Sequence, residues 1–298
     1  MKIHAIQTGR VQIKAAHVRA RREERADRLR DVLDDPEWVD PLPILCWAIE
    51  HSEGVIVVDT GETHLANEPG YLPEGHPFFG TCERRWLAPD DEIGPQLRLL
   101  GIDPGDVRTV VMTHMHGDHA GGLAHFPQAE FILSTREAEM ALSPRGPQMG
   151  YLNYHYPTWF APRAVGLDKG TWESFDTSVP ITEAADVRLV PTPGHTIGHV
   201  SVAVEEPDHV VLIAGDASYT VPALLEGLID GVAQDAALER DSHRRLRELA
   251  ERRPVIYLPS HDPDAPRRLG EREPLNTHVP TAIPVTYQSS PAASEGAG

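Results

Sequence analysis

Residues 113–122 constrain the fold of this chain more than any other stretch. They read Thr-His-Met-His-Gly-Asp-His-Ala-Gly-Gly and directly follow an apolar run, residues 107–112, that is typical of a buried strand. Side chains alternate along extended backbone, so His114 and His116 point the same way and can share one metal ion. Asp118 and His119 lie beyond Gly117 and can turn toward a second ion. The spacing predicts a site for two metals at the exit of a strand.

A simpler interpretation of the same residues is available. Histidines are common in this chain, which has 16, and Asp118 could serve only as the N-cap of a helix. However, three histidines and a carboxylate packed this closely would repel one another and lose hydration without gain, unless a cation lies between them. The spacing also differs from the helical H-E-x-x-H zinc motif, because Met115 and Gly117 stand where that motif needs a helix and a Glu. We therefore favour a metal site of another architecture.

Charge and cysteine content restrict the class of partner. The 298 residues include 27 Lys and Arg against 45 Asp and Glu, a formal net charge of −18, which disfavours nucleic acid and anionic membranes as partners. The two cysteines, Cys46 and Cys82, form no C-x-x-C pair, so we expect free thiols. No secretory leader and no apolar run of membrane-spanning length is recognised, so we expect a soluble, cytoplasmic protein that acts on a small molecule.

The N-terminal part is expected to carry strands and one charged helix. Residues 2–14 predict a strand with a turn or bulge at Gly9, and residues 15–35 predict a helical insertion whose arginines alternate with acidic residues. A solvated, salt-bridged helix face is favoured there over an arm that docks a partner. Residues 44–49 and 55–61 predict a β-hairpin that ends at Asp59, which either braces the metal site or closes a turn.

The central part indicates α/β layering. A helix is expected over residues 91–101, then the metal-bearing strand, a helix beginning within 121–125, a strand over 130–134 and a helix over 135–142. Residues 143–175 depart from this order, because they are rich in Pro and Gly yet also aromatic. They form either an ordinary insertion or, as we favour, a lid beside the metals with Tyr154, Trp159 and Phe160 as apolar contacts for a substrate tail.

Three further ligand candidates follow later strands. Strands are expected over residues 186–190, 200–204, 210–214 and 255–258, with a helix over 235–252. His195, Asp216 and His261 stand at strand exits in this part of the chain. We expect residues 1–268 to form a single domain and residues 270–298, which lack periodicity, to form an extended or disordered tail.

The complete ligand set, His114-x-His116-x-Asp118-His119 followed by His195, Asp216 and His261, resembles that of the metallo-β-lactamase superfamily. This resemblance implies an αββα sandwich, in which two mixed β-sheets are flanked by helices and loops at one edge form the site. Within the superfamily the chain is similar to the N-acyl-homoserine lactone lactonases, which are quorum-quenching enzymes and often dimerise. The similarity is carried by residues 59–61, 195–201, 216–220 and 260–262, and above all by Tyr219, three residues after Asp216.

The resemblance also implies roles for the site residues. His114, His116 and His195 would bind one ion, Asp118, His119 and His261 the other, and Asp216 would bridge the two. Nitrogen and oxygen ligands suit zinc, although manganese, cobalt and iron are compatible. Two such ions lower the pKa of a shared water to about 7, so the resulting hydroxide can open a lactone without a Ser or Cys nucleophile.

Two side chains of the site are expected to take part in the reaction itself. Tyr219 would donate to the developing oxyanion and Asp118 would protonate the departing alkoxide. Without the resemblance, Tyr219 would be interpreted as a packed tyrosine at a strand end. Two alternatives to a lactonase remain. One is a thioester or phosphoester hydrolase with the same metals, and the other is a non-catalytic metal-binding protein.

Overall fold

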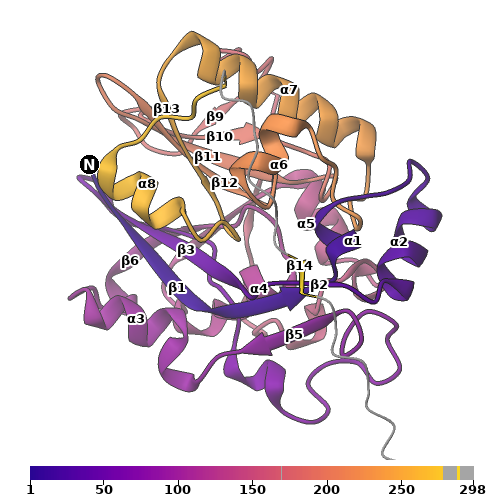
Figure 1. The fold of residues 1–298 in the computed structure, drawn as a ribbon. Coiled ribbons are helices and arrows are strands. Elements are labelled where there is room, and N and C mark those ends of the chain that lie inside the picture. The colour runs from indigo at the N-terminus through magenta and orange to yellow at the C-terminus, as the bar shows by residue number, and fades with distance from the viewer. Residues whose placement is uncertain (169, 278–286, 289–298) are drawn as a thin grey trace, which may run out of the picture.

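The computed structural model describes residues 1–168, 170–277 and 287–288. Two β-sheets lie face to face, and helices cover the outer face of each sheet (Figure 1). In this view α7 lies over one sheet at the top and α3 lies beside the other at the lower left. The predicted αββα sandwich is confirmed.

The first sheet has seven strands in the order β5-β1-β3-β4-β6-β7-β8. The strands are β1 (Lys2–Ile13), β3 (Leu42–His51), β4 (Gly54–Val58), β5 (Glu83–Trp86), β6 (Val107–Val111), β7 (Glu130–Ser134) and β8 (Arg163–Val165). The predicted hairpin is confirmed, since β3 pairs with β4 in antiparallel register, whereas β4, β6, β7 and β8 run parallel. The β1–β3 register shifts between Gln7 and Arg10, where Gly9 has a φ of 125°, so the expected irregularity at Gly9 is also present.

The second sheet has five strands in the order β13-β12-β11-β10-β9. They are β9 (Val179–Pro180), β10 (Val187–Pro191), β11 (Val200–Glu205), β12 (Val210–Gly215) and β13 (Val255–Pro259). Strands β12 and β13 are parallel, and the chain between them includes α7, as parallel neighbours require a crossover. A short third pairing joins β2 (Trp38–Val39) to β14 (Tyr287–Gln288).

The helices are α1 (Ala15–Val18), α2 (Arg25–Asp34), α3 (Ile93–Leu99), α4 (Gly117–Ala120), α5 (Thr135–Ala141), α6 (Val221–Glu226), α7 (Ala236–Arg252) and α8 (Ala265–Glu271). The helices predicted over residues 91–101, 135–142 and 235–252 are present with small differences at their ends. The helix expected to begin within 121–125 is a short 3-10 turn, Leu123–His125, and a separate helical turn, α4, precedes it within the motif itself. None of the helices in the described ranges is long and apolar enough to cross a membrane.

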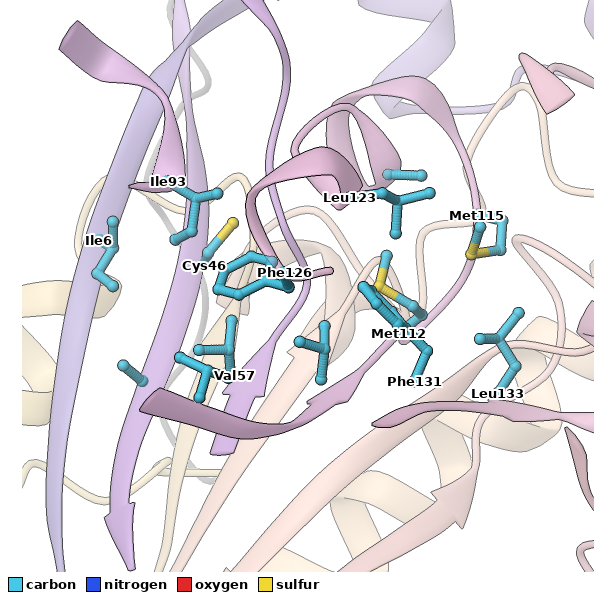
Figure 2. Close-up of a cluster of buried hydrophobic side chains, with 14 of the residues drawn as sticks. Ile6, Cys46, Val57, Ile93, Met112, Met115, Leu123, Phe126, Phe131 and Leu133 are labelled. Carbon is cyan, nitrogen blue, oxygen red and sulfur yellow. The ribbon is translucent and has the colours of Figure 1, made fainter. Parts of the chain in front are cut away.

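Strand β3 shows how the sequence produces the layers. Leu45, Trp47 and Ile49 pack between the two sheets, whereas Cys46 and Ala48 point to the opposite face, under α3. This alternation follows from the two-residue period of a strand. Figure 2 shows the cluster on the outer face of the first sheet, where the strand residues Cys46 and Val57 meet Ile93, Leu123 and Phe126. Both faces of the central strands are therefore buried, and the strand exits are held at one edge.

The single helix predicted over residues 15–35 is wrong in its middle. The structure has two short helices, α1 and α2, with non-helical backbone between them. Arg19 is extended, and the Ala20 N–H donates to the carbonyl of Ile229 at 2.7 Å instead of continuing the helix. The Asp35 carboxylate accepts from the Ala16 N–H at 2.6 Å and from Arg21 at 3.1 Å. Tertiary partners therefore outweigh the local helical preference of this segment.

The two remaining irregular segments differ from the predictions in part. In residues 143–175, Tyr154 and Trp159 are exposed and Phe160 packs on Phe131, with ring centroids 5.0 Å apart. The tail predicted from residue 270 is wrong at its start, because α8 continues to Glu271 and Leu275 is buried in the core. The rest of that prediction lies outside the described residues, apart from the two residues of β14.

Candidate metal centre

The structure brings all seven predicted ligands together at one edge of the sandwich. The 113–119 segment follows β6, and His195 lies between β10 and β11. Asp216 follows β12 directly, and His261 lies two residues after the end of β13. One oxygen of Asp216 lies 3.4 Å from His119 Nε2, and the other lies 3.4 Å from His261 Nε2 and 3.6 Å from His195 Nε2. Asp216 is therefore central in the cluster.

The ligand atoms divide into overlapping groups that could each hold an ion. His114, His116 and His195 form one group, and Asp118, His119 and His261 form another, with the ligand atoms of each group within 4.8 Å of one another. A third group consists of His114, His119 and Asp216, whose ligand atoms also lie within 4.8 Å of one another. Because Asp216 contacts both histidine sets, its carboxylate is placed to serve two ions at once.

Unpaired ligand atoms show that these residues fit a pair of cations. His114 Nε2, His119 Nε2 and Asp216 Oδ1 are fully buried and have no hydrogen-bond partner among the described residues. An orphaned buried polar atom costs about 1–3 kcal/mol, and a cation contacting these atoms would remove that cost. His116 Nδ1 and His195 Nε2 lie only 2.9 Å apart, so their lone pairs converge as in a shared ion's ligands.

The electrostatics of the cluster agree with this fit. Burial lowers the pKa of His114 well below its usual value and that of His116 to about 3, so both rings are neutral and keep a lone pair for a metal. Burial also acts to lower the pKa of His119, but the carboxylates of Asp216, Asp59 and Asp118 raise it well above its usual value. The acidic side of the cluster thus attracts positive charge to its centre.

Oxygen atoms of neighbouring residues orient the ligand histidines. Asp59 accepts from the Thr113 N–H and hydroxyl, both at 2.7 Å, and its Oδ2 lies 2.8 Å from His119 Nδ1. Of the two interpretations of Asp59, this geometry supports the brace. His195 Nδ1 lies 2.8 Å from Asp230 Oδ2, and His261 Nδ1 lies 2.9 Å from the Pro43 carbonyl. Metal-binding histidines commonly donate their second N–H to such oxygens.

Two further residues fix the loops that carry the ligands. Glu137 accepts from the Met115 N–H at 2.9 Å and from the Thr196 hydroxyl at 2.6 Å, so it ties the two histidine-bearing loops together. His199 Nε2 accepts from the Asp216 N–H at 3.0 Å. Sequence reasoning missed the roles of Glu137 and Asp230, because their partners are distant in the chain. No motif of their own marks them.

Tyr219 lies beside the cluster. Its ring centroid is 5.4 Å from that of His261 and 6.0 Å from that of His195. Burial, reinforced by the carboxylates of Asp230 and Asp216, raises the pKa of Tyr219 well above its usual value. The hydroxyl therefore keeps its proton and is a hydrogen-bond donor at neutral pH.

A cavity with about 850 Å³ of empty space, open to solvent, lies over the ligand cluster. The ligand cluster and Tyr219 form what we call the floor, and the residues around the opening form what we call the wall. The wall consists of side chains from β1, α2, the 76–85 segment and the 148–150 segment, together with Val232: Val11, Ile13, Arg25, Leu29, His76, Phe78, Phe79, Glu83, Arg85, Gln148, Met149 and Val232. In residues 143–175, Gln148, Met149 and Gly150 line this cavity, whereas Tyr154, Trp159 and Phe160 do not.

Comparison with known proteins agrees with this geometry. The family model of the metallo-beta-lactamase superfamily matches residues 39–261. The chain is 28% identical to the N-acyl homoserine lactonase AttM of Azorhizobium caulinodans, over 89% of this chain and 94% of that protein. It is 32% identical to an N-acyl homoserine lactonase of Bacillus thuringiensis, over 74% and 82%.

A solved structure is similar over nearly the same length. It is that of an N-acyl homoserine lactone hydrolase with the product N-hexanoyl-L-homoserine bound at the catalytic metal center. The match has a TM-score of 0.72 at 25% identity and covers 89% of this chain and 95% of that one. The layered fold, the convergent ligand cluster and these matches agree with one another. The chain therefore belongs to the metallo-beta-lactamase superfamily and is similar along most of its length to N-acyl homoserine lactonases.

Proposed function

We propose that this protein is a dinuclear metal-dependent hydrolase that opens the lactone ring of N-acyl homoserine lactones. One observation carries the proposal: unpaired, fully buried ligand atoms of His114, His119 and Asp216 converge at the floor of a cavity. The lactone substrate class is supported by relatives that are named N-acyl homoserine lactonases and match most of the chain.

The ligand roles follow the two groups of donor atoms. His114, His116 and His195 would hold one ion, Asp118, His119 and His261 would hold the other, and Asp216, which lies near His119 and His261, would serve both. Zinc is the metal we propose, because nitrogen and carboxylate ligands suit it. When bound, the ion pair supplies a hydroxide nucleophile at neutral pH and polarises the ester carbonyl, so no Ser or Cys nucleophile is needed.

The chain's own side chains complete the site. Tyr219 remains protonated and, next to His195 and His261, donates to the carbonyl oxygen as negative charge develops on it. Asp118, with its Oδ2 3.4 Å from His261 Nε2, is partly exposed to the cavity. Its carboxylate takes up the proton of the nucleophile once that has added to the carbonyl, and passes this proton to the alkoxide that leaves when the ring opens. Apolar wall residues such as Leu29, Phe78 and Phe79 exclude water around the acyl chain.

A substrate panel tests the proposal. The zinc-loaded protein is incubated with N-hexanoyl homoserine lactone, a thioester and an aryl phosphotriester, and products are identified by mass spectrometry. We expect ring opening of the lactone, with addition of one water, to have the highest kcat/KM. Faster turnover of the thioester or phosphotriester would support the alternative hydrolase, and bound metal without turnover of any substrate would support a non-catalytic protein.

Some expectations stay predictions alongside this proposal. They are the cytoplasmic location, the homodimer, the single domain over residues 1–268 and the lid role of residues 143–175. The lid role is tested below with a substitution at Trp159.

A further inference from the structure

His17 is a polar side chain in the substrate cavity that the reaction described above does not use. It lies on α1, is 7% exposed and lines the same cavity as Tyr219, His195 and Asp216. Its ring meets the ring of Tyr219 edge-on, with centroids 5.8 Å apart and an interplanar angle of 71°. His17 therefore contacts Tyr219, whose ring in turn lies beside the ligand histidines His195 and His261.

His17 differs from the ligand histidines in its hydrogen bonding. The Nδ1 atoms of His119, His195 and His261 each lie within 2.9 Å of a protein oxygen. His17 Nδ1 is equally buried but has no hydrogen-bond partner among the described residues. Because Nδ1 is enclosed by the protein, a ligand in the cavity that His17 lines would reach the ring at its other nitrogen, Nε2.

The charge state of His17 suits a neutral ligand. Burial lowers the pKa of His17 to about 4, although the carboxylate of Asp230 opposes this shift. At neutral pH the imidazole is therefore uncharged, with one N–H donor and one nitrogen acceptor. Depending on the tautomer, the nitrogen that a ligand can reach carries the N–H or the lone pair, and an amide can accept from the first or donate to the second.

The backbone fixes His17 relative to the metal centre. The carbonyl of His17 accepts from the Gly231 N–H at 2.7 Å, and the neighbouring Ala16 N–H donates to Asp35 at 2.6 Å. A Cβ at Gly231 would overlap the carbonyl oxygen of Ala16, so this close approach requires glycine. The same loop carries Asp230, which orients His195. The position of His17 is thus coupled to the floor of the site.

We propose that His17 is a substrate-binding residue that hydrogen-bonds the amide group joining the acyl chain to the lactone ring. The inference rests on the proposed function and deepens it. In an N-acyl homoserine lactone the amide nitrogen is attached to the carbon next to the lactone carbonyl. With that carbonyl at Tyr219, the amide lies within reach of the neighbouring side chain, which is His17. The acyl chain then extends toward Val11, Ile13 and Leu29.

Two substrates and two variants test this assignment. The substrates are N-hexanoyl homoserine lactone and a γ-butyrolactone with an alkyl chain of matched length on the carbon next to the carbonyl, which lacks the amide. His17→Leu is expected to lower kcat/KM for the acyl homoserine lactone about tenfold, mostly through KM, as the loss of one hydrogen bond implies. The alkyl lactone should change less than about twofold. His17→Gln, which restores a donor and an acceptor, should recover most of the loss.

Controls separate this proposal from a structural role and from the proposed function. His4→Leu removes a histidine of β1 that contacts Glu50 outside the cavity, and it should affect neither substrate. Metal content and Tm are measured for every variant. Equal losses on both substrates, or a loss of bound metal in His17→Leu, would overturn the role of His17 while leaving lactone hydrolysis intact. A wild-type protein that opens neither lactone would overturn the proposed function and this inference with it.

Discussion

The floor and the wall of the cavity are built in different ways. The floor consists of side chains that follow the central strands, and most of them are almost fully buried and braced by hydrogen bonds, as Asp59 braces His119. Much of the wall comes from segments outside the two sheets, chiefly α2 and residues 76–79, where Phe78 and Phe79 are half-buried. From this difference we expect the fold to fix the chemistry and the segments around the opening to set substrate preference. Substitutions in the two regions should therefore have separable effects.

The largest effect is expected from a ligand of the floor. His114→Ala removes a fully buried ligand nitrogen and should lower kcat roughly a thousandfold, because a metal ion supplies several kcal/mol of transition-state stabilisation. Elemental analysis should show less metal per chain. His209→Ala, at a partly buried histidine that contacts Asp208 and does not line the cavity, is the matched control and should change neither quantity. Full metal content and turnover in His114→Ala would remove it from the site.

A smaller effect is expected from the brace of the floor. Asp59→Asn keeps the shape of the side chain but weakens its hold on His119 and Thr113, so metal affinity should fall about 10–100-fold. Competition with a chromogenic chelator measures this affinity. Asp103→Asn, at an exposed aspartate that accepts from the Gly105 N–H, is the control. An unchanged affinity in Asp59→Asn would favour the simple turn role for this residue.

Tyr219→Phe should change turnover without changing metal binding. The lost hydroxyl is proposed to donate to the developing oxyanion, and removal of one such donor costs roughly 10–100-fold in kcat in a site that also has metal ions. Steady-state kinetics with metal analysis measures both quantities. Tyr154→Phe, at an exposed tyrosine, is the control. Wild-type kcat in a metal-replete Tyr219→Phe protein would leave Tyr219 as a packed side chain.

The smallest effect is expected from the wall. Phe79→Ala should raise KM about threefold for a long-chain lactone and leave a short-chain lactone and the metal content unchanged, because it removes only apolar contact area. Trp159→Ala, in the segment that the sequence favours as a lid, should leave KM unchanged for both chain lengths, since Trp159 lies outside the cavity. The reverse pattern would support the aromatic lid of residues 143–175.

The floor was predictable from the sequence, for a physical reason. Apolar runs of strand length end at His114, at Asp216 and at His261, and strand exits in a layered sheet meet at one edge. Local pattern is sufficient here because the strands are buried on both faces. The two-residue period of β3 separates Leu45, Trp47 and Ile49 from Cys46 and Ala48, but since both sets are apolar, only the structure shows which layer each set faces.

The wall, and the residues that orient the ligand histidines from outside the cluster, were not predictable in the same way. The helix expected over residues 15–35 divides because Ala20 and Asp35 bond to partners that a local pattern does not reveal. Phe78 and Phe79 lie in an irregular segment without periodicity, so nothing in the sequence places them at the cavity. Asp230 is 35 residues from His195, and only the folded chain brings the two together.

Zinc titration is the most direct test of the central claim, which is metal-dependent lactone hydrolysis at a dinuclear centre. Chelator-treated protein is titrated with zinc while ring opening of N-hexanoyl homoserine lactone is followed. The account predicts no turnover without metal and a rise in rate that reaches its plateau at two ions per chain. Ring opening by the metal-free protein, or a plateau at one ion per chain, would contradict it.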